Sequence, residues 1–186
     1  MADLLVALLH HPVYDKHGDV VTSAVTPIDV PDIARSCKTF GVAGFYVVTP
    51  VDPLRALVRR ILNHWDDGYG REYNPNRSEA MEVVRLEASL EGVEIDVERR
   101  YGCLPRLFAT TARETPRSRT FGEMHRLLAE EGPPWLMLLG TGWGLTSGVL
   151  DRCEAVLEPI AGAGDYNHLS VRAAAAILLD RLRCPR

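Results

Sequence analysis

Short apolar runs alternate with amphipathic stretches along the whole chain. Five of the runs are almost continuous in apolar residues, at positions 4–9, 44–49, 107–111, 135–139 and 155–160. Such runs are typical of strands that are covered on both faces, as in a parallel sheet. A sixth run, 93–97, alternates apolar with acidic residues and predicts a strand at the edge of the sheet. We therefore expect an α/β fold with a mostly parallel sheet and helices on both faces.

The stretches between these runs carry helix signals. Apolar residues between Leu54 and Trp65 recur at i, i+3 and i+4 steps, the pattern of a helix with one buried face. Asp29 is a suitable N-cap, and Gly41 suits the left-handed position that ends many helices. The pattern predicts helices at 29–41, 52–65, 78–90, 121–131 and 168–182.

The composition is that of a globular protein. The chain has 186 residues, 46% hydrophobic and 25% charged, which fits a single domain and excludes disordered, collagen-like and coiled-coil chains. Its net charge of −4 disfavours a polybasic nucleic-acid binder but is compatible with a local basic face. The apolar run 4–9 is too short to cross a bilayer and follows no basic leader, so we expect a cytoplasmic protein without a membrane partner.

Cysteines and histidines do not form the spacing of a metal or dithiol site. No pair of cysteines has C-x-x-C spacing, so we expect reduced thiols at Cys37, Cys103, Cys153 and Cys184. The adjacent His10 and His11 would face opposite sides of a strand. We therefore expect no metal ion.

Glycine-rich turns follow predicted strands in the second half of the chain. They are LGTGWGLTSG at 139–148 and EPIAGAGDYNHLS at 158–170, and the turn ATTAR at 109–113 ends a further strand. Glycines let backbone amides approach a ligand at the carboxyl edge of a parallel sheet. Neither G-x-G-x-x-G nor G-x-x-x-x-G-K-[ST] is present, which disfavours the two common phosphate cradles. A purely structural tight turn is the alternative for 139–148.

Together these segments make the chain similar to the SPOUT-class RNA methyltransferases, above all to a small bacterial group that depends on S-adenosylmethionine. The resemblance covers residues 1–186, from LLHHPVYDKHGDVVTSAVTPIDVPDIARSCKTFGV through GYGREYNPNR and LLGTGWGL to YNHLSVRAAAAILLDRL. It implies one domain, with a deep trefoil knot within about 105–182 whose three turns hold S-adenosylmethionine. The residues that it assigns to the cofactor are Thr110, Leu139, Gly140, Gly142, Gly144, Leu145, Ile160, Leu169 and Ser170.

The resemblance also implies a residue that activates the methyl acceptor. DVPDIARSCKTFGV is similar to a motif of ribose 2′-O-methylating members, in which an arginine follows six residues after an asparagine; Arg35 and Asp29 hold these positions here. A guanidinium clamps phosphate and stabilises a developing alkoxide, so Arg35 is the predicted catalytic residue. The aspartate and the absence of a glutamate in GTGWGL leave both a ribose oxygen and a base nitrogen open as acceptor. A surface arginine paired with Asp32 is the alternative for Arg35.

RNA contacts are predicted in two basic segments. Arg71 and Arg77 lie beside Tyr69 and Tyr73, which suits phosphate contacts and base stacking, and Arg113 begins the second segment, ARETPRSR. A solvated loop is the alternative for each segment.

The resemblance further implies a homodimer in which the arginine of one subunit approaches the cofactor of the other. The alanine-rich helix at 168–182 is the predicted interface element. The expected function is S-adenosylmethionine-dependent methyl transfer to structured RNA such as tRNA or rRNA, with ribose 2′-O as one candidate acceptor. The alternative is a non-catalytic nucleotide- or RNA-binding α/β module that keeps the cofactor fold.

Overall fold

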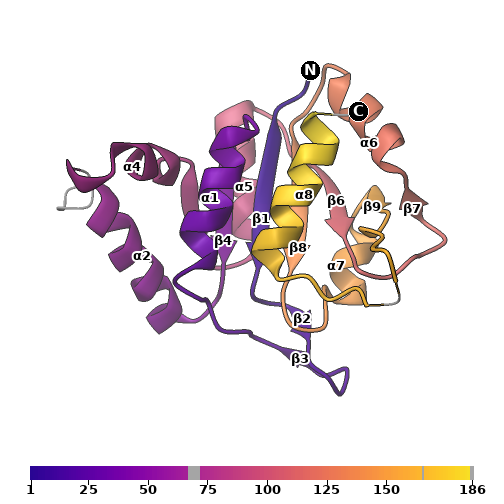
Figure 1. Cartoon of the computed structure of the whole chain (residues 1–186), viewed down its shortest axis with the longest axis horizontal. Coiled ribbons are helices and arrows are strands. Elements are labelled where there is room, and N and C mark those ends of the chain that lie inside the picture. Colours follow the sequence, from indigo (N-terminus) through magenta and orange to yellow (C-terminus); the bar gives the residue numbers. More distant parts are fainter. Residues whose placement is uncertain (67–71, 165, 185–186) are drawn as a thin grey trace.

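One parallel sheet organises the chain in the computed structural model, which describes residues 1–66, 72–164 and 166–184 (Figure 1). Within these ranges the sheet has the strand order β5-β4-β1-β8-β6-β9-β7, and every neighbouring pair is parallel. The expected mostly parallel sheet is therefore confirmed. Its strands are β1 (Leu4–Leu9), β4 (Gly44–Val48), β5 (Val84–Glu87), β6 (Arg106–Thr110), β7 (Ser118–Arg119), β8 (Trp135–Gly140) and β9 (Ala155–Leu157).

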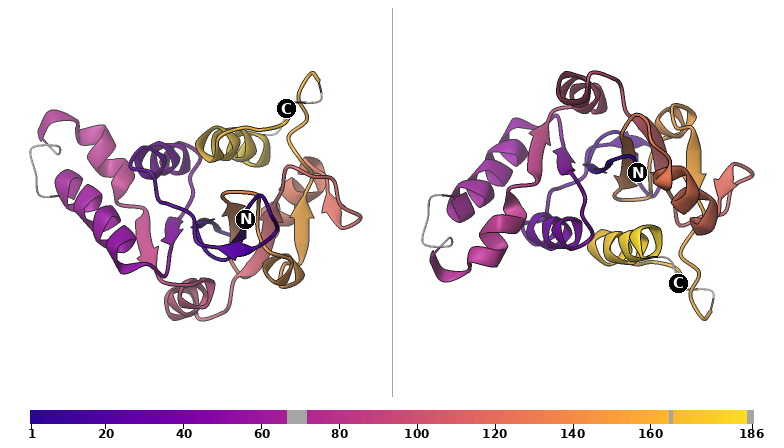
Figure 2. Two further views of the ribbon diagram at one scale, coloured as in Figure 1. Left: turned by 90° about the horizontal axis from the view of Figure 1, so that it is seen from below. Right: turned by 90° about the horizontal axis from the view of Figure 1, so that it is seen from above.

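Helices cover both faces of the sheet (Figure 2). One face carries α1 (Asp29–Thr39) and α8 (Val171–Arg183) side by side, with α6 (Phe121–Ala129) next to α8. The opposite face carries α5 (Leu90–Tyr101) and α7 (Ser147–Asp151). Near the β5 edge, α2 (Asp52–Asp66) and α4 (Pro75–Met81) pack against each other, and α4 also packs against α1. A small antiparallel ribbon of β2 (Val13–Tyr14) and β3 (Val20–Val21) follows β1.

The central strand β1 contributes side chains to two hydrophobic cores, one on each face of the sheet. Leu4, Val6 and Leu8 pack into the core under α1 and α8. Leu5, Ala7 and Leu9 pack into the core under α5 and α7. Successive side chains of a strand point to opposite faces, so a strand that is apolar throughout buries every one of them. Each fully buried leucine contributes roughly 2 kcal/mol.

Residues 78–97 fold differently from the prediction. The helix expected at 78–90 and the edge strand expected at 93–97 are both wrong, because α4 ends at Met81, β5 follows, and α5 begins at Leu90. Leu90, Val93 and Val97 are spaced i, i+3 and i+7 and are buried on one side of α5, which overrides the alternating pattern. The edge strand is β5 instead.

Other element ends shift by a few residues. The N-cap of α1 is Ile28 rather than Asp29, whose carboxylate is engaged elsewhere. Strand β9 ends at Leu157 instead of 160, and α8 begins at Val171 instead of 168. Among the described residues, no helix is long and apolar enough to cross a membrane. The four cysteines are free thiols, and burial raises the pKa of Cys153 to about 11.

Candidate functional site

Three turns leave the sheet at one edge. They are the turns 110–113, 140–145 and 158–170, which follow β6, β8 and β9, respectively. In the sheet β6 lies between β8 and β9, with Ala109 paired to Leu138 and Thr110 paired to Leu157. Because the strands are parallel, their carboxyl ends meet at the same edge, where α/β folds bind ligands. The fold therefore brings together the segments that the sequence assigned to the cofactor.

A hydrogen bond joins two of these segments directly, and a second one ties the first turn to strand β8. The side-chain amide of Asn167 donates to the carbonyl oxygen of Ala112 at 3.2 Å, which ties the turn 158–170 to the turn 110–113. The hydroxyl of Thr110 donates to the carbonyl oxygen of Leu138 at 3.0 Å. The predicted cofactor residue Thr110 thus links the first turn to β8.

The turn 140–145 is folded tightly against β2. A Cβ atom at Gly140 would lie 3.0 Å from the backbone nitrogen of Leu145, and one at Gly142 would lie 2.9 Å from the carbonyl oxygen of Tyr14. Gly142 also has φ +59, which favours glycine. Tyr14 completes the contact, because its N–H donates to the Gly144 carbonyl at 2.9 Å and its carbonyl accepts from Trp143 N–H at 3.0 Å.

Gly144 shows the opposite environment. An added Cβ would meet no described atom within 4 Å there, and its φ is +106. One side of the turn is consequently held by β2, while the backbone around Gly144 borders open space. The open surface beside Gly144 has room for a flat, neutral group such as adenine, which does not need a basic side chain as a partner.

The remaining predicted cofactor residues differ in how far their side chains are exposed to solvent. Leu139 and Leu145 are buried, so only their main-chain groups are available to a ligand. Ile160 packs partly against the core, and Leu169 is 46% exposed. The hydroxyl of Ser170 accepts from Ala173 N–H at 3.4 Å, because Ser170 is the N-cap of α8. Its side chain therefore serves the helix as well as bordering the third turn.

Arg35 lies along α1, away from the end of the helix that adjoins these turns. The beginning of α1 is tied to the beginning of α8 near the carboxyl edge, and six residues of helix separate Asp29 from Arg35, a rise of about 9 Å. The Arg35 side chain is 59% exposed, and its Nη1 is 3.9 Å from Asp32 Oδ1. An exposed ion pair of this length contributes little. Arg35 is therefore available to another molecule.

Asp29 has a role that the sequence did not reveal. Its carboxylate is almost completely buried, accepts from Arg172 Nη1 at 3.0 Å and also accepts from the Thr26 hydroxyl. Arg172 is the second residue of α8, directly after the turn 158–170. The residue that departs from the asparagine of the family motif thus fastens α1 to α8. No local sequence pattern indicates this pair, because the partners are 143 positions apart along the chain.

A partly buried chain of polar side chains contacts the turn 140–145. His10 Nδ1 lies 2.9 Å from Ser23 Oγ, Ser23 Oγ bonds Thr141 Oγ1, and the Thr141 hydroxyl donates to the Leu9 carbonyl at 3.2 Å. Because the Thr141 hydroxyl donates its proton to the Leu9 carbonyl, the Ser23 hydroxyl must be the donor to Thr141 Oγ1. Ser23 Oγ then accepts from His10, so the imidazole carries its proton on Nδ1. Burial lowers the pKa of His10 to about 4, so the imidazole is neutral. Its Nε2 has no hydrogen-bond partner among the described residues.

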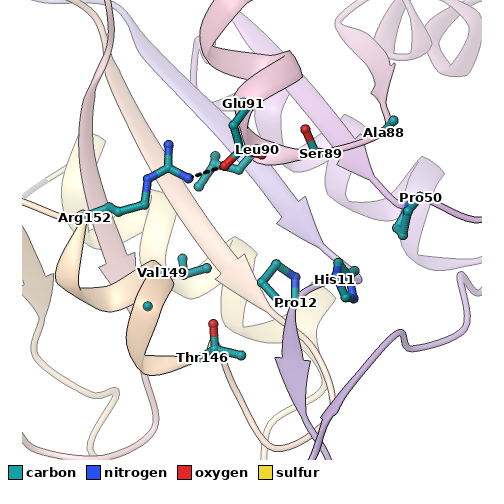
Figure 3. A pocket seen from close by; sticks show the side chains of 11 residues that line it. His11, Pro12, Pro50, Ala88, Ser89, Leu90, Glu91, Thr146, Val149 and Arg152 are labelled. Carbon is teal, nitrogen blue, oxygen red and sulfur yellow. Dashed lines mark hydrogen bonds and ion pairs between the residues drawn. The ribbon is translucent and has the colours of Figure 1, made fainter.

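A pocket of about 470 Å³ opens at the same edge, between α5 and α7 (Figure 3). Arg152 lies at its side, 2.6 Å from Glu91 Oε1, and also pairs with Glu94. Two carboxylates neutralise this guanidinium, which argues against an anion site. None of the predicted cofactor residues lines the pocket, whose lining includes His11, Pro12, Pro50, Ser89 and Thr146.

Each of the two histidines at the end of β1 has a separate environment. His10 belongs to the partly buried chain of polar side chains, whereas His11 lines the pocket. Within the described residues, no group of three or more His, Cys, Asp or Glu side chains is placed to hold a metal ion.

The predicted RNA-binding arginines are in different situations. Arg71, like Tyr69, lies outside the described residues. The Arg77 guanidinium lies 5.0 Å from the centre of the Trp65 ring. In the segment ARETPRSR, Arg117 donates to the Cys153 carbonyl at 2.6 Å and Arg119 is 3.8 Å from Glu123. Arg117 and Arg119 each form an ion pair, whereas the exposed Arg113 forms none with the described residues.

Comparison with known proteins gives a match along almost the whole chain. Residues 3–184 match a family model described as SAM-dependent RNA methyltransferase. An "Uncharacterized protein" of Aquifex aeolicus is 38% identical over 180 residues, 97% of this chain and 88% of that protein. A protein of Oleidesulfovibrio alaskensis named tRNA (guanine-N(1)-)-methyltransferase is 42% identical over 97% of this chain but only 42% of its own length. The chain therefore spans less than half of that relative.

Solved structures are similar at the level of the fold. The SpoU methyltransferase AviRb of Streptomyces viridochromogenes, solved with the cofactor AdoMet, has a TM-score of 0.55 and 18% identity. The alignment covers 97% of this chain and 56% of that chain. The similarity supports the SPOUT fold that the sequence implied.

Proposed function

Because the chain belongs to the family of SAM-dependent RNA methyltransferases, we propose that its turns 110–113, 140–145 and 158–170 together form the S-adenosylmethionine site. The observation that carries the proposal is the hydrogen bond from Asn167 to Ala112, which joins the first and third turns at the ends of neighbouring strands. The residues proposed to contact the cofactor are Thr110, Leu139, Gly140, Gly142, Gly144, Leu145, Ile160, Leu169 and Ser170.

In this proposal the turns hold the cofactor in position and exclude water from it, and they transfer no proton. When bound, S-adenosylmethionine supplies an electrophilic methyl group on a positively charged sulfonium. The surface beside Gly144 is open and leaves room for the adenine ring, while the buried side chains of Leu139 and Leu145 fix the backbone of the turn in place. Positioning an acceptor in line with a methyl group accounts for a large part of such a rate acceleration.

Arg35 is proposed to hold the acceptor nucleotide across a homodimer. It is exposed on α1, about 9 Å of helix beyond the edge that carries its own cofactor turns. Next to it, α8 presents the partly exposed small residues Ala173 and Ala176, which allow close approach of a second helix. A guanidinium binds phosphate bidentately and stabilises negative charge on an attacking oxygen.

The proposed substrate is structured RNA such as tRNA or rRNA. Arg113 and Arg77 are the described arginines proposed to contact it, together with Arg71. The motif around Arg35 favours a ribose 2′-oxygen as acceptor, whereas the name of the Oleidesulfovibrio relative points to a guanine nitrogen. That name describes a protein more than twice as long as the matched segment, so the ribose oxygen is the acceptor that we propose.

The proposal includes one domain over residues 1–186 and a trefoil knot within about 105–182. The strand order supports the knot, because β8 is inserted between β1 and β6, and the chain then returns through β9 to place α8 beside α1.

Calorimetry with S-adenosylmethionine and S-adenosylhomocysteine tests the cofactor site. We expect micromolar binding, lost in Gly142→Val because the new side chain would collide with the Tyr14 carbonyl. Gly148→Ala is the matched control, since an added Cβ there meets no described atom within 4 Å, and it should bind normally. No heat with either ligand for the unaltered protein would defeat the proposal.

Transfer of labelled methyl groups to unmodified RNA tests the reaction itself. We expect incorporation that falls by at least about tenfold in Arg35→Ala, followed by identification of the nucleoside by mass spectrometry. Tight cofactor binding without any incorporation would favour a non-catalytic binding module. Unchanged incorporation in Arg35→Ala would remove this residue from the mechanism.

A further inference from the structure

A groove of about 410 Å³ lies between α1 and α2, away from the cofactor turns. We call it the α1–α2 groove. Pro31 and Ile61 belong to its apolar wall, and Arg60, His64, Trp65 and Arg77 supply its polar and aromatic groups. Its volume is within the range of sites for small molecules or single nucleotides and far below that of a duplex.

The groove concentrates positive charge on an acidic chain. Arg60 is exposed and makes no ion pair among the described residues. Arg77 contacts the Trp65 ring rather than a carboxylate. The nearby Lys38 and Glu79 neutralise each other at 3.1 Å. With a net charge of −4 for the chain, two uncompensated guanidinium groups at one groove form a local basic site for an anion.

Flat groups surround these charges. The Arg77 guanidinium lies 5.0 Å from the centre of the half-buried Trp65 ring, and the His64 ring meets Trp65 edge-on at 5.0 Å. A planar guanidinium on an indole offers a surface on which a nucleobase stacks, and stacking of this kind requires a base that is not paired in a duplex. The positive charge and the flat stacking surface therefore both favour an unpaired nucleotide, which has a phosphate and an exposed base.

We propose that the α1–α2 groove binds one unpaired nucleotide of the RNA substrate, with its phosphate on Arg60 and its base stacked against Trp65 and Arg77. The inference rests on the proposed function and adds the requirement for a single-stranded nucleotide. Pro31 and Arg35 are four residues apart and share a face of α1, a rise of about 6 Å. The bound nucleotide is therefore a close neighbour of the one that Arg35 holds.

The test measures binding of a fluorescently labelled single-stranded oligoribonucleotide and of a labelled RNA duplex by anisotropy. We expect Arg60→Ala and Trp65→Leu each to weaken single-strand binding by about tenfold, with a much smaller effect on the duplex. Arg59→Ala is the matched control, because this exposed neighbour removes the same charge from α2 without lining the groove. It should change both affinities by less than about twofold.

A second variant separates stacking from folding. Arg77→Lys keeps the positive charge but loses the planar group, so it should weaken single-strand binding by several-fold without lowering the thermal midpoint. S-adenosylhomocysteine affinity, measured by calorimetry, should be the same in all these variants. If the unaltered protein binds RNA but not S-adenosylhomocysteine, the proposed function is wrong, whereas the nucleotide site in the groove is still supported.

Three results would contradict the proposal that the α1–α2 groove binds an unpaired nucleotide of RNA. Equal losses in Arg59→Ala and Arg60→Ala would show a diffuse basic surface. Equal losses for duplex and single strand would show phosphate contact without stacking. Adenosine monophosphate that binds as tightly as the oligonucleotide, with the same dependence on Arg60, would show a site for a free nucleotide.

Discussion

His10 is a buried residue that links the turn 140–145 to a group whose protonation changes with pH. Burial lowers its pKa from the ordinary 6.5 to about 4. Between these values the unfolded chain binds a proton that the folded chain does not, so stability decreases as pH falls through this window. A difference of this size corresponds to about 3 kcal/mol when the window has been crossed completely.

We expect the free energy of unfolding to be lower by about 2 kcal/mol at pH 5 than at pH 7.5, with His10 as a main contributor. His10→Gln keeps a donor for Ser23 but removes the titrating group. Urea unfolding at both pH values should show a smaller difference for this variant. An identical pH dependence in both proteins would contradict the neutral buried imidazole.

Among individual residues, those in the glycine-rich turns were predictable and those beneath them were not. Gly140 and Gly142 stand in a conspicuous sequence pattern, and their contacts with Leu145 and Tyr14 explain why glycine is needed. His10 and Thr141 are 131 positions apart and meet only through Ser23. No local pattern encodes such a contact, because it depends on where the sheet places the ends of β1 and β8.

The helices α1 and α8 are held together by the Asp29–Arg172 ion pair. Arg172→Met should leave the buried Asp29 carboxylate without its cation and destabilise the fold by about 1–3 kcal/mol. Asp29→Asn removes the charge while the side chain can still bond Thr26. The double variant should therefore recover part of the loss of the Arg172→Met variant.

A double-mutant cycle by chemical denaturation measures this coupling. S-adenosylhomocysteine affinity is a second readout, because Arg172 follows the turn 158–170 directly and its loss should weaken ligand binding as well. Additive effects of the two substitutions on stability would show that the pair does not couple the helices.

Sequence patterns located the buried strands better than the edge elements. Strands β1, β4 and β8 are covered on both faces, so their apolar runs have one interpretation. At β5 and α5 only one face is buried, and VEIDV satisfies a strand pattern as well as a helix pattern. Ser89 and Gly102, the two caps of α5, were the local signals that distinguish the alternatives.

At the scale of the whole molecule, the proposed homodimer predicts complementation between inactive variants. Arg35→Ala and Gly142→Val should each leave at most about a tenth of the methyl transfer. In a mixed dimer, an intact arginine from one subunit meets an intact turn from the other. Random mixing should therefore restore about a quarter of the unaltered activity, since half of the dimers are mixed and each has one working site.

Subunit exchange followed by the labelled-methyl assay measures this recovery. Two unaltered proteins mixed in the same way control for losses during exchange. If both residues act within one subunit, every site in the mixture carries a defect, and activity stays at the level of the single variants.

The proposed knot predicts a property of the closed chain. The ends of the described chain lie close together, with Arg183 Nη1 3.1 Å from Met1 Sδ, so a short linker could join them (Figure 1). A ring closed in the folded state should stay knotted and have a smaller hydrodynamic radius in denaturant than a ring closed after prolonged unfolding. Equal radii in size-exclusion chromatography would contradict the knot.

The three tryptophans are distributed over three separate regions. Trp143 is 57% exposed in the turn 140–145, Trp65 lies in the α1–α2 groove, and Trp135 is buried at the start of β8. Replacing two of them by phenylalanine leaves one indole as an intrinsic optical reporter. Without an added dye, emission from Trp143 would then follow the turn 140–145, emission from Trp65 the groove, and emission from Trp135 the core.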